Sequence, residues 1–316
     1  MSHKYEGVNL WVYIPNKGIA FFFLFAFSVL TTIHFWQCCL YRSFKLTGLF
    51  IVAGLLYVVG FALRINGAFR NYEESDLFIA SVTLIYASPP LIALATYKIL
   101  SRVLAYVPYV SPAPPRWTLL FLTVLTLAIE ALSGAAAASL ATSPSPFPPS
   151  PPSSRGAALL WAAIAAQLGA LAGAGLLAAV ARRRCVRARL AAARGVLSTV
   201  YVGLALLAVR AAYRVAEQTA PEAVARRAEW PFCTFDAAAT LAALALWAAR
   251  HPRRRALPPD ARTYLSRDGL TEVTPQDDTA AWDPLRECRC ARDKARGRIE
   301  RGGDGRSGDE FVLFQV

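Results

Sequence analysis

Apolar residues fall into seven long runs along the chain, and short polar stretches separate them. The runs cover residues 18–40, 46–65, 77–100, 117–140, 156–181, 195–216 and 231–249. A helix needs about 20 apolar residues to cross the hydrocarbon core of a bilayer, and each run is about that long. Because unpaired backbone groups are costly in lipid, a run of this length forms a helix there. The pattern predicts an all-α polytopic membrane protein, a bundle of seven transmembrane helices.

The runs and their flanks divide the chain into three segments. Residues 1–17 form a short N-terminal segment, residues 18–252 hold the transmembrane domain, and residues 253–316 form a basic tail. The tail is rich in arginine and glycine and has no run of membrane length, so we expect it to be largely disordered. The first run is too long for the apolar region of a cleaved signal peptide, and we expect it to remain as a signal anchor.

Composition and charge agree with a membrane protein. Hydrophobic residues make up 55% of the 316-residue chain, above the roughly 45–50% typical of soluble domains. The net charge is +13, and a basic chain can indicate nucleic-acid binding. Here, however, the arginines cluster at the ends of the apolar runs, where membrane proteins carry cytoplasmic charge. We therefore expect membrane lipids, and no nucleic acid, as partners.

The distribution of Lys and Arg between the loops predicts the orientation, because cytoplasmic loops carry the excess of these residues. One side of the bundle holds Arg42, Lys45, Arg102, Arg116, the six arginines of 182–194 and the arginines of 250–255. The other side holds Lys4, Lys17, Arg70, Arg155, Arg226 and Arg227. The first side should be cytoplasmic, which places the N-terminus outside and the tail inside.

The last two runs carry charges within their apolar stretches. Arg210, Arg214 and Glu217 share a helix face, because residues four and seven apart point the same way. Arg210 and Asp236 each lie about seven residues from the loop that joins the two runs, or about 10 Å below the surface at ~1.5 Å per residue. Charges at such a depth are costly without a partner or a water-filled cavity. We therefore expect an ion pair between Arg210 and Asp236.

These charges also form part of a recognisable pattern. The chain reads Arg210-x-x-Tyr213-Arg214-x-x-Glu217, then Glu229-Trp230, Asp236 and His251-Pro252. This combination resembles the signature of the fungal lipid-translocating exporter family, the RTA-like proteins with seven membrane helices. Further positions match the family pattern: Gly60, Arg64, Pro89, Ala93, Tyr97, Arg102 and Gln167. The resemblance implies a substrate site or buried charge network made of Arg64, Arg210, Tyr213, Arg214, Glu217, Glu229 and Asp236.

The chain departs from the family pattern at two positions that would carry acids. Tyr57 stands where the pattern has a glutamate, and Val124 or Leu125 stands where it has an aspartate. Glu130 lies deep in the fourth run but outside the family register. A lone acid in a membrane helix is a functional candidate, and both a proton relay and a partnership with Arg64 are open roles. For Arg64 itself, the alternative is a side chain that reaches the membrane interface.

Two further features concern helix shape and packing. Pro89 and Pro90 lie near the middle of the third run, and we expect them to kink the helix or break it locally. The small residues Gly169, Gly173 and Gly175 would let a neighbouring helix approach closely, although chance also explains them in so alanine-rich a run.

No catalytic set is visible in the sequence. There is no Ser-His-Asp pattern, Walker A loop or glycine-rich nucleotide fingerprint. The three histidines are too few for a His-rich metal centre, and the six cysteines include no C-x-x-C pair. We expect a protein that is not an enzyme and that holds no metal and no cofactor.

The resemblance implies a function in moving or exporting amphiphilic lipids, such as sphingoid long-chain bases, and in resistance to toxic amphiphiles. An ammonium group could bind at Glu217, Asp236 or Glu130, whereas Arg210 and Arg214 could hold a phosphate. The alternative is a receptor-like sensor or regulator of membrane lipid stress, because seven spans with an outside N-terminus are also a receptor layout. We expect a multi-pass protein of the plasma membrane, with an endomembrane as the alternative location.

Overall fold

The computed structural model describes residues 16–69, 75–141, 154–219, 229–255, 257, 263–265 and 272–273. The chain divides into two units, residues 1–272 and residues 273–316. All of the described helices lie in the first unit, and the description below concerns that unit.

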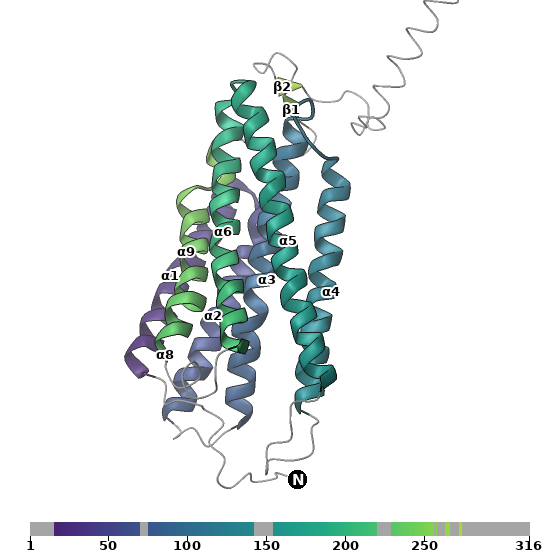
Figure 1. The fold of residues 1–316 in the computed structure, drawn as a ribbon. Helices are drawn as coiled ribbons and strands as arrows, with labels where there is room; N and C mark the ends of the chain where they lie inside the picture. Colours follow the sequence, from purple (N-terminus) through teal and green to yellow (C-terminus); the bar gives the residue numbers. More distant parts are fainter. Residues whose placement is uncertain are drawn as a thin grey trace, which may run out of the picture. The chain divides into compact units, whose positions relative to one another are not determined.

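The described elements are helical apart from two short strands (Figure 1). The first six helices are α1 (Lys17–Tyr41), α2 (Phe44–Phe69), α3 (Ser75–Tyr106), α4 (Pro115–Ala141), α5 (Ser154–Arg187) and α6 (Ala191–Thr219). They are followed by α8 (Glu229–Pro231), the π-helix η1 (Phe232–Ala237), α9 (Ala238–Ala249) and α10 (Pro252–Arg255). The strands β1 (Tyr264–Leu265) and β2 (Glu272–Val273) pair in a two-stranded sheet.

The predicted helices are present. Within the described residues, seven helices are long and apolar enough to cross a membrane, the last of them formed by η1 and α9 together. Successive long helices pack side by side, and α3 also contacts α6, while α1 contacts α9 (Figure 1). The α1–α2 connection consists of Arg42 and Ser43 alone. Arg42 takes a left-handed conformation, with φ at 47°, and its backbone N–H bonds Cys38 O and Cys39 O at the end of α1.

The sequence predicts a loop in the basic run of residues 182–189, but most of this run is helical. α5 continues through most of it and ends at Arg187, and the connection to α6 is only three residues long, 188–190. Arginine favours the helical conformation, and its positive charge is stabilised at a helix C-terminus, where the backbone carbonyls carry partial negative charge. The run therefore extends the helix instead of interrupting it.

The third long helix passes through both of its prolines. α3 is continuous from Ser75 to Tyr106, so the helix is not broken at Pro89 and Pro90, and a kink there stays a prediction. Two serines of α3 bind the backbone of α2: Ser81 Oγ donates to Gly60 O at 2.8 Å, and Ser88 Oγ donates to Ala53 O at 2.8 Å. These bonds fix α2 against α3 on both sides of the middle of α2.

The glycines that permit close helix contact are not the ones expected from α5. A Cβ built on Gly169, Gly173 or Gly175 meets no atom within 4 Å, which favours chance, the alternative explanation of these glycines. In α2, a Cβ on Gly60 would lie 2.7 Å from Ile85 Cγ1 and 3.3 Å from Ser81 O of α3. The missing side chain at Gly60 therefore lets α2 and α3 approach.

The end of the bundle at which α9 stops is closed by polar contacts to α1. His34 Nε2 donates to Leu244 O at 3.0 Å, and Gln37 Nε2 donates to Ala248 O at 2.7 Å. The ring of His251 stacks on Tyr41 at 4.8 Å between centroids. Burial lowers the pKa of His251 to about 4, so this ring is neutral at neutral pH. The His251-Pro252 pair of the family pattern therefore ends α9 against the α1–α2 connection.

The tail predicted from residue 253 onward lies largely outside the described residues. Its first part is described: α10 ends at Arg255, and Leu257 is buried, with its backbone N–H bonded to Pro252 O at 3.4 Å. The bundle therefore includes a short segment after the last span.

We predict that Gly60→Ala destabilises the folded protein by about 1–3 kcal/mol, the usual cost of overpacking. The added Cβ would collide with the Ile85 side chain, and the nearby Ser81 carbonyl oxygen leaves the Cβ little room to move away from it. Thermal unfolding of the purified protein in detergent measures the change. Gly173→Ala is the matched control, because its Cβ meets open space. Equal effects of the two substitutions would contradict this account of α2–α3 packing.

Candidate functional site: a buried arginine–carboxylate cluster

Asp236 lies at the centre of the site, on the π-helix that begins the last span. Its side chain is completely buried. A π-helical turn holds an extra residue and therefore changes the direction in which side chains point, and such turns are frequent at functional sites. Thr240 follows Asp236 by four residues and donates its Oγ1 hydrogen to Asp236 O at 2.8 Å. This bond joins the π-helix to the start of α9.

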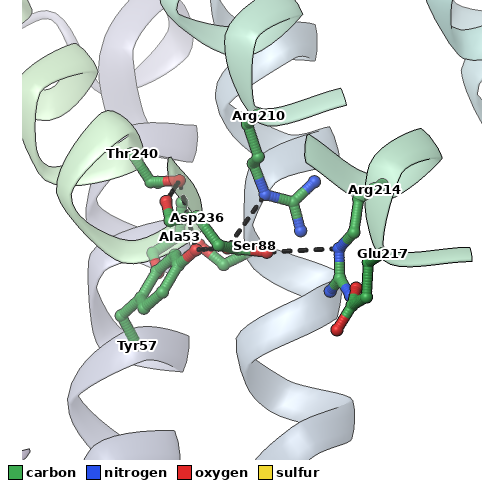
Figure 2. Close-up of polar contacts among 8 residues, drawn as sticks. All are labelled: Ala53, Tyr57, Ser88, Arg210, Arg214, Glu217, Asp236 and Thr240. Carbon is green, nitrogen blue, oxygen red and sulfur yellow. Dashed lines mark hydrogen bonds and ion pairs between the residues drawn. The ribbon is translucent and has the colours of Figure 1, made fainter. Parts of the chain in front are cut away.

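The carboxylate of Asp236 binds two arginines of α6 (Figure 2). Arg210 Nε lies 3.1 Å from Oδ1, and both side chains are buried, as expected for the predicted ion pair. Arg214 Nε lies 3.2 Å from Oδ2, a second pairing that the sequence did not indicate. Each carboxylate oxygen therefore faces one positive charge, which offsets the cost of burying Asp236 in an apolar bundle.

A third group reaches Asp236 from α2. Tyr57 Oη lies 3.3 Å from Asp236 Oδ1 and 3.2 Å from Thr240 Oγ1, and its ring stacks on Phe27 at 4.2 Å between centroids. Tyr57 stands where the family pattern has an acid. In this chain a neutral hydroxyl, and not a second carboxylate, meets Asp236.

Arg214 connects the buried centre to a more exposed carboxylate. Its Nη1 donates to Glu217 Oε2 at 2.5 Å, and its guanidinium lies 3.6 Å from the centroid of the Tyr86 ring on α3. The Glu217 side chain is 22% exposed, against 0% for Asp236. The cluster made of Tyr57, Arg210, Arg214, Glu217, Asp236 and Thr240 thus carries two positive and two negative charges, with Glu217 at its accessible edge (Figure 2).

Arg64 and Tyr213, two further residues of the predicted site, lie apart from these bonds. Arg64 is buried, and its guanidinium carbon lies 5.2 Å from the centroid of the Phe232 ring, so it does not reach out to the interface. Tyr213 stacks on Phe235 at 6.0 Å, and Phe235 lies 6.3 Å from Trp230. These three rings form an aromatic patch beside the start of the last span.

Glu229 and Glu130 are the two remaining acids of the predicted site. The side chain of Glu229 lies outside the described part of the structure. Glu130 borders a small cavity together with Arg210 and interacts electrostatically with it. Pro89 and Pro90 border the same cavity. Within the described residues, no group of three or more His, Cys, Asp and Glu side chains could hold a metal ion.

Sequence reasoning did not assign Thr240 and Tyr57 to the cluster, and it did not predict the contact of Tyr86 with Arg214. Thr240 follows Asp236 by four residues, and this spacing could have indicated its bond to the Asp236 backbone. Tyr86 and Tyr57 lie on α3 and α2, more than 100 residues away from their partners in α6 and the last span. Without a charge or a regular spacing to mark them, neither tyrosine could be assigned a contact from the sequence.

Comparison with known proteins identifies the family. The model of the RTA1-like protein family matches residues 50–258, a range that contains every residue of the cluster. This chain belongs to the RTA1-like family. It is also 34% identical over 301 residues to a Leptosphaeria maculans protein named lipid-translocating exporter-like protein RTA1. The match covers 88% of this chain and 57% of the relative, so the chain spans little more than half the length of that protein.

No solved structure matches the chain. With its seven candidate spans and its family match, the protein is a multi-pass membrane protein of the RTA1-like family.

We predict that Arg210→Ala destabilises the protein by about 3–5 kcal/mol, because it leaves a buried carboxylate with one partner fewer. The double variant Arg210→Ala with Asp236→Ala should recover part of that loss. Denaturant unfolding of the four proteins of this double-mutant cycle in detergent gives the coupling energy. Arg183→Ala, which removes an exposed arginine, controls for the loss of a positive charge. Additive effects of the two single substitutions would show that the pair contributes no interaction energy.

Proposed function

We propose that this RTA1-like protein moves or exports amphiphilic lipids with a cationic head group, such as sphingoid long-chain bases, and thereby confers resistance to toxic amphiphiles. The family membership and the name of the relative support a lipid substrate. The observation that supports a cationic head group is the position of Glu217, an accessible carboxylate at the edge of a charge cluster whose other carboxylate is buried.

The two carboxylates of the cluster suit different roles. Asp236 is fully buried and already binds Arg210, Arg214 and Tyr57. An ammonium group could reach it only by displacing an arginine, so Asp236 holds the helices together. Glu217 is partly exposed, and its one described partner is Arg214. A ligand can therefore approach Glu217 without dismantling the buried centre.

Aromatic rings lie close to this carboxylate along the helix. Tyr213 precedes Glu217 by four residues, so the two side chains share a face of α6. Tyr213 stacks on Phe235, and Trp230 adds a third ring whose side chain is 64% exposed. Cations are attracted to the faces of aromatic rings, and the hydrocarbon chain of an amphiphile packs against them. A carboxylate beside exposed rings suits an amphiphilic amine.

The same cluster is less suited to a phosphate head group. Arg210 and Arg214 are the arginines that could receive it, but each already has its Nε within 3.2 Å of an Asp236 oxygen. Arg214 also binds Glu217. With their charge offset by two carboxylates, these arginines attract an anion only weakly, and we favour the amine.

A receptor-like sensor of membrane lipid is the second candidate function. It is favoured by the two arginines that already neutralise Asp236 and by the size of the cavity that Arg210 borders, about 20 Å³, which is far too small for a lipid head group. The two functions predict different rates of lipid movement between the leaflets of the membrane. Vesicles that contain the purified protein should move a fluorescent long-chain base between leaflets if the protein is a transporter, and should not if it only senses the lipid.

We predict that Glu217→Gln abolishes resistance to toxic sphingoid bases in a sensitised cell at unchanged protein abundance. The substitution is nearly isosteric and removes only the charge that would receive the ammonium group. Growth on the toxic base, with the protein quantified by immunoblot, measures the effect. The unmutated chain must first confer resistance, and Glu217→Asp should restore part of it. Full resistance of Glu217→Gln at normal abundance would remove Glu217 from the substrate site and favour the sensor.

We also propose that the N-terminus lies outside and the end of α9 faces the cytoplasm, in the plasma membrane or an endomembrane. The support is the excess of arginine at that end, which includes the last turns of α5.

In a protein without its native cysteines, a cysteine replacing Arg183 should resist an impermeant thiol reagent in intact cells, whereas one replacing Ser150 should react. If the protein resides in an endomembrane, sealed microsomes take the place of cells and the Arg183 position is the one that reacts. Labelling of both positions in detergent is the control for reactivity. The reverse pattern in either preparation would invert the proposed orientation.

A further inference from the structure

Arg210 also borders a second polar feature of the bundle. A cavity of about 20 Å³ lies between α3, α4, α5 and α6. It is lined by Pro89, Pro90, Ala93, Tyr97, Thr126, Ile129, Glu130, Gln167, Ala170, Leu171, Leu207 and Arg210. A space of this size holds a single water molecule, provided that polar groups are there to bind it.

The lining supplies such groups from each of the four helices. Glu130 comes from α4, Gln167 from α5, Arg210 from α6 and Tyr97 from α3. The Thr126 hydroxyl donates its hydrogen to Leu122 O at 2.8 Å and can only accept from a water. The cavity therefore offers donors and acceptors on several sides, whereas an empty cavity in a protein is normally apolar.

Glu130 is the unusual member of this lining. It lies within the fourth span, Pro115–Ala136, and within the described residues no hydrogen bond to its carboxyl group is found, although it interacts electrostatically with Arg210. An ionised carboxylate in a membrane is costly unless a partner or water stabilises it. Glu130 must therefore carry a proton or reach Arg210 through a bound water.

We propose that this cavity is a proton-binding site, in which one water joins Glu130 to Arg210 and Glu130 takes up and releases a proton. The proton arrives on water as hydronium. An O–H bond of the hydronium breaks, a new O–H bond forms on a Glu130 carboxylate oxygen, and neutral water stays in the cavity. Release reverses these steps. Across the cavity, Glu130 faces the charged Arg210 and the titratable Tyr97, while α5 contributes the uncharged amide of Gln167.

The position of Arg210 links this site to the buried cluster. Arg210 binds Asp236 through Nε at 3.1 Å and also borders the cavity. With Glu130 ionised, two carboxylates attract the same guanidinium, and with Glu130 protonated only Asp236 does. The proton on Glu130 therefore changes how firmly Arg210 holds Asp236, and by linkage the state of the cluster changes how readily the proton binds. Through this link a proton gradient could drive substrate movement, a consequence that rests on the proposed function.

Infrared difference spectroscopy of the full chain in lipid nanodiscs tests the proton site directly. As the pH is lowered, we expect the C=O stretch of a protonated carboxyl group that disappears in Glu130→Gln and remains in Glu217→Gln. In Asp236→Asn the same band should change frequency, because Arg210 is released from Asp236 toward Glu130. Carboxyl-¹³C labelling of the glutamates in the unmutated protein assigns the band even if a variant fails to fold.

Several infrared results would overturn the proposal. A carboxyl band that survives in Glu130→Gln, or that labelled glutamate does not shift, would overturn the proposal, and so would a band that Asp236→Asn leaves unchanged. A site that responds to sodium and shows no protonated carboxyl group would also overturn it.

A flux assay distinguishes this proposal from the proposed function. In vesicles that move a long-chain base, a proton gradient should alter the flux for the unmutated protein, and this dependence should be lost in Glu130→Gln. A gradient-dependent flux that Glu130→Gln retains would overturn the proposal. If the unmutated protein moves no lipid, the proposed function fails, while the infrared result still decides the proton site.

Discussion

The need to neutralise a carboxylate in the middle of an apolar bundle constrains this structure more than any other interaction. Asp236 is fully buried, and an unpaired charge there would cost several kcal/mol. Its partners come from two other helices, Arg210 and Arg214 from α6 and Tyr57 from α2. Apolar side chains in a membrane pack in many registers, because lipid is as apolar as they are. The bonds to Asp236 are directional and therefore fix how α2, α6 and the last span lie against one another.

Tyr57, which departs from the family pattern, contacts Asp236 through a neutral hydroxyl. A glutamate at this position would place a second carboxylate beside Asp236, and like charges at this distance are unfavourable without a further cation. In this chain the tyrosine offers a neutral donor, and two arginines balance two carboxylates. Arg64, which matches the family pattern in the same helix, lies on the Phe232 ring.

The sequence predicted the parts of the structure that depend on periodicity and depth. Seven runs of apolar residues indicated seven helices, and equal distances from a shared loop indicated the Arg210–Asp236 pair, which the structure contains. It did not predict the bond from Tyr57 or the contact of Tyr86 with Arg214, because each joins helices that are far apart in sequence and depends on the rotation of each helix. It also placed a loop in the basic run of 182–189, because charge was taken to end a helix that arginine in fact extends.

Arginine is the side chain that can connect the buried cluster to the cavity. Its guanidinium is planar, stays charged in any environment and presents five N–H donors in fixed directions. Arg210 binds Asp236 through Nε and also borders the cavity that Glu130 lines. A lysine would present a single ammonium group and could bind one carboxylate only by releasing the other. Arg210 and Arg214 together therefore place three acids within one electrostatic system: Glu217 binds Arg214, Asp236 binds both arginines, and Glu130 borders the cavity with Arg210.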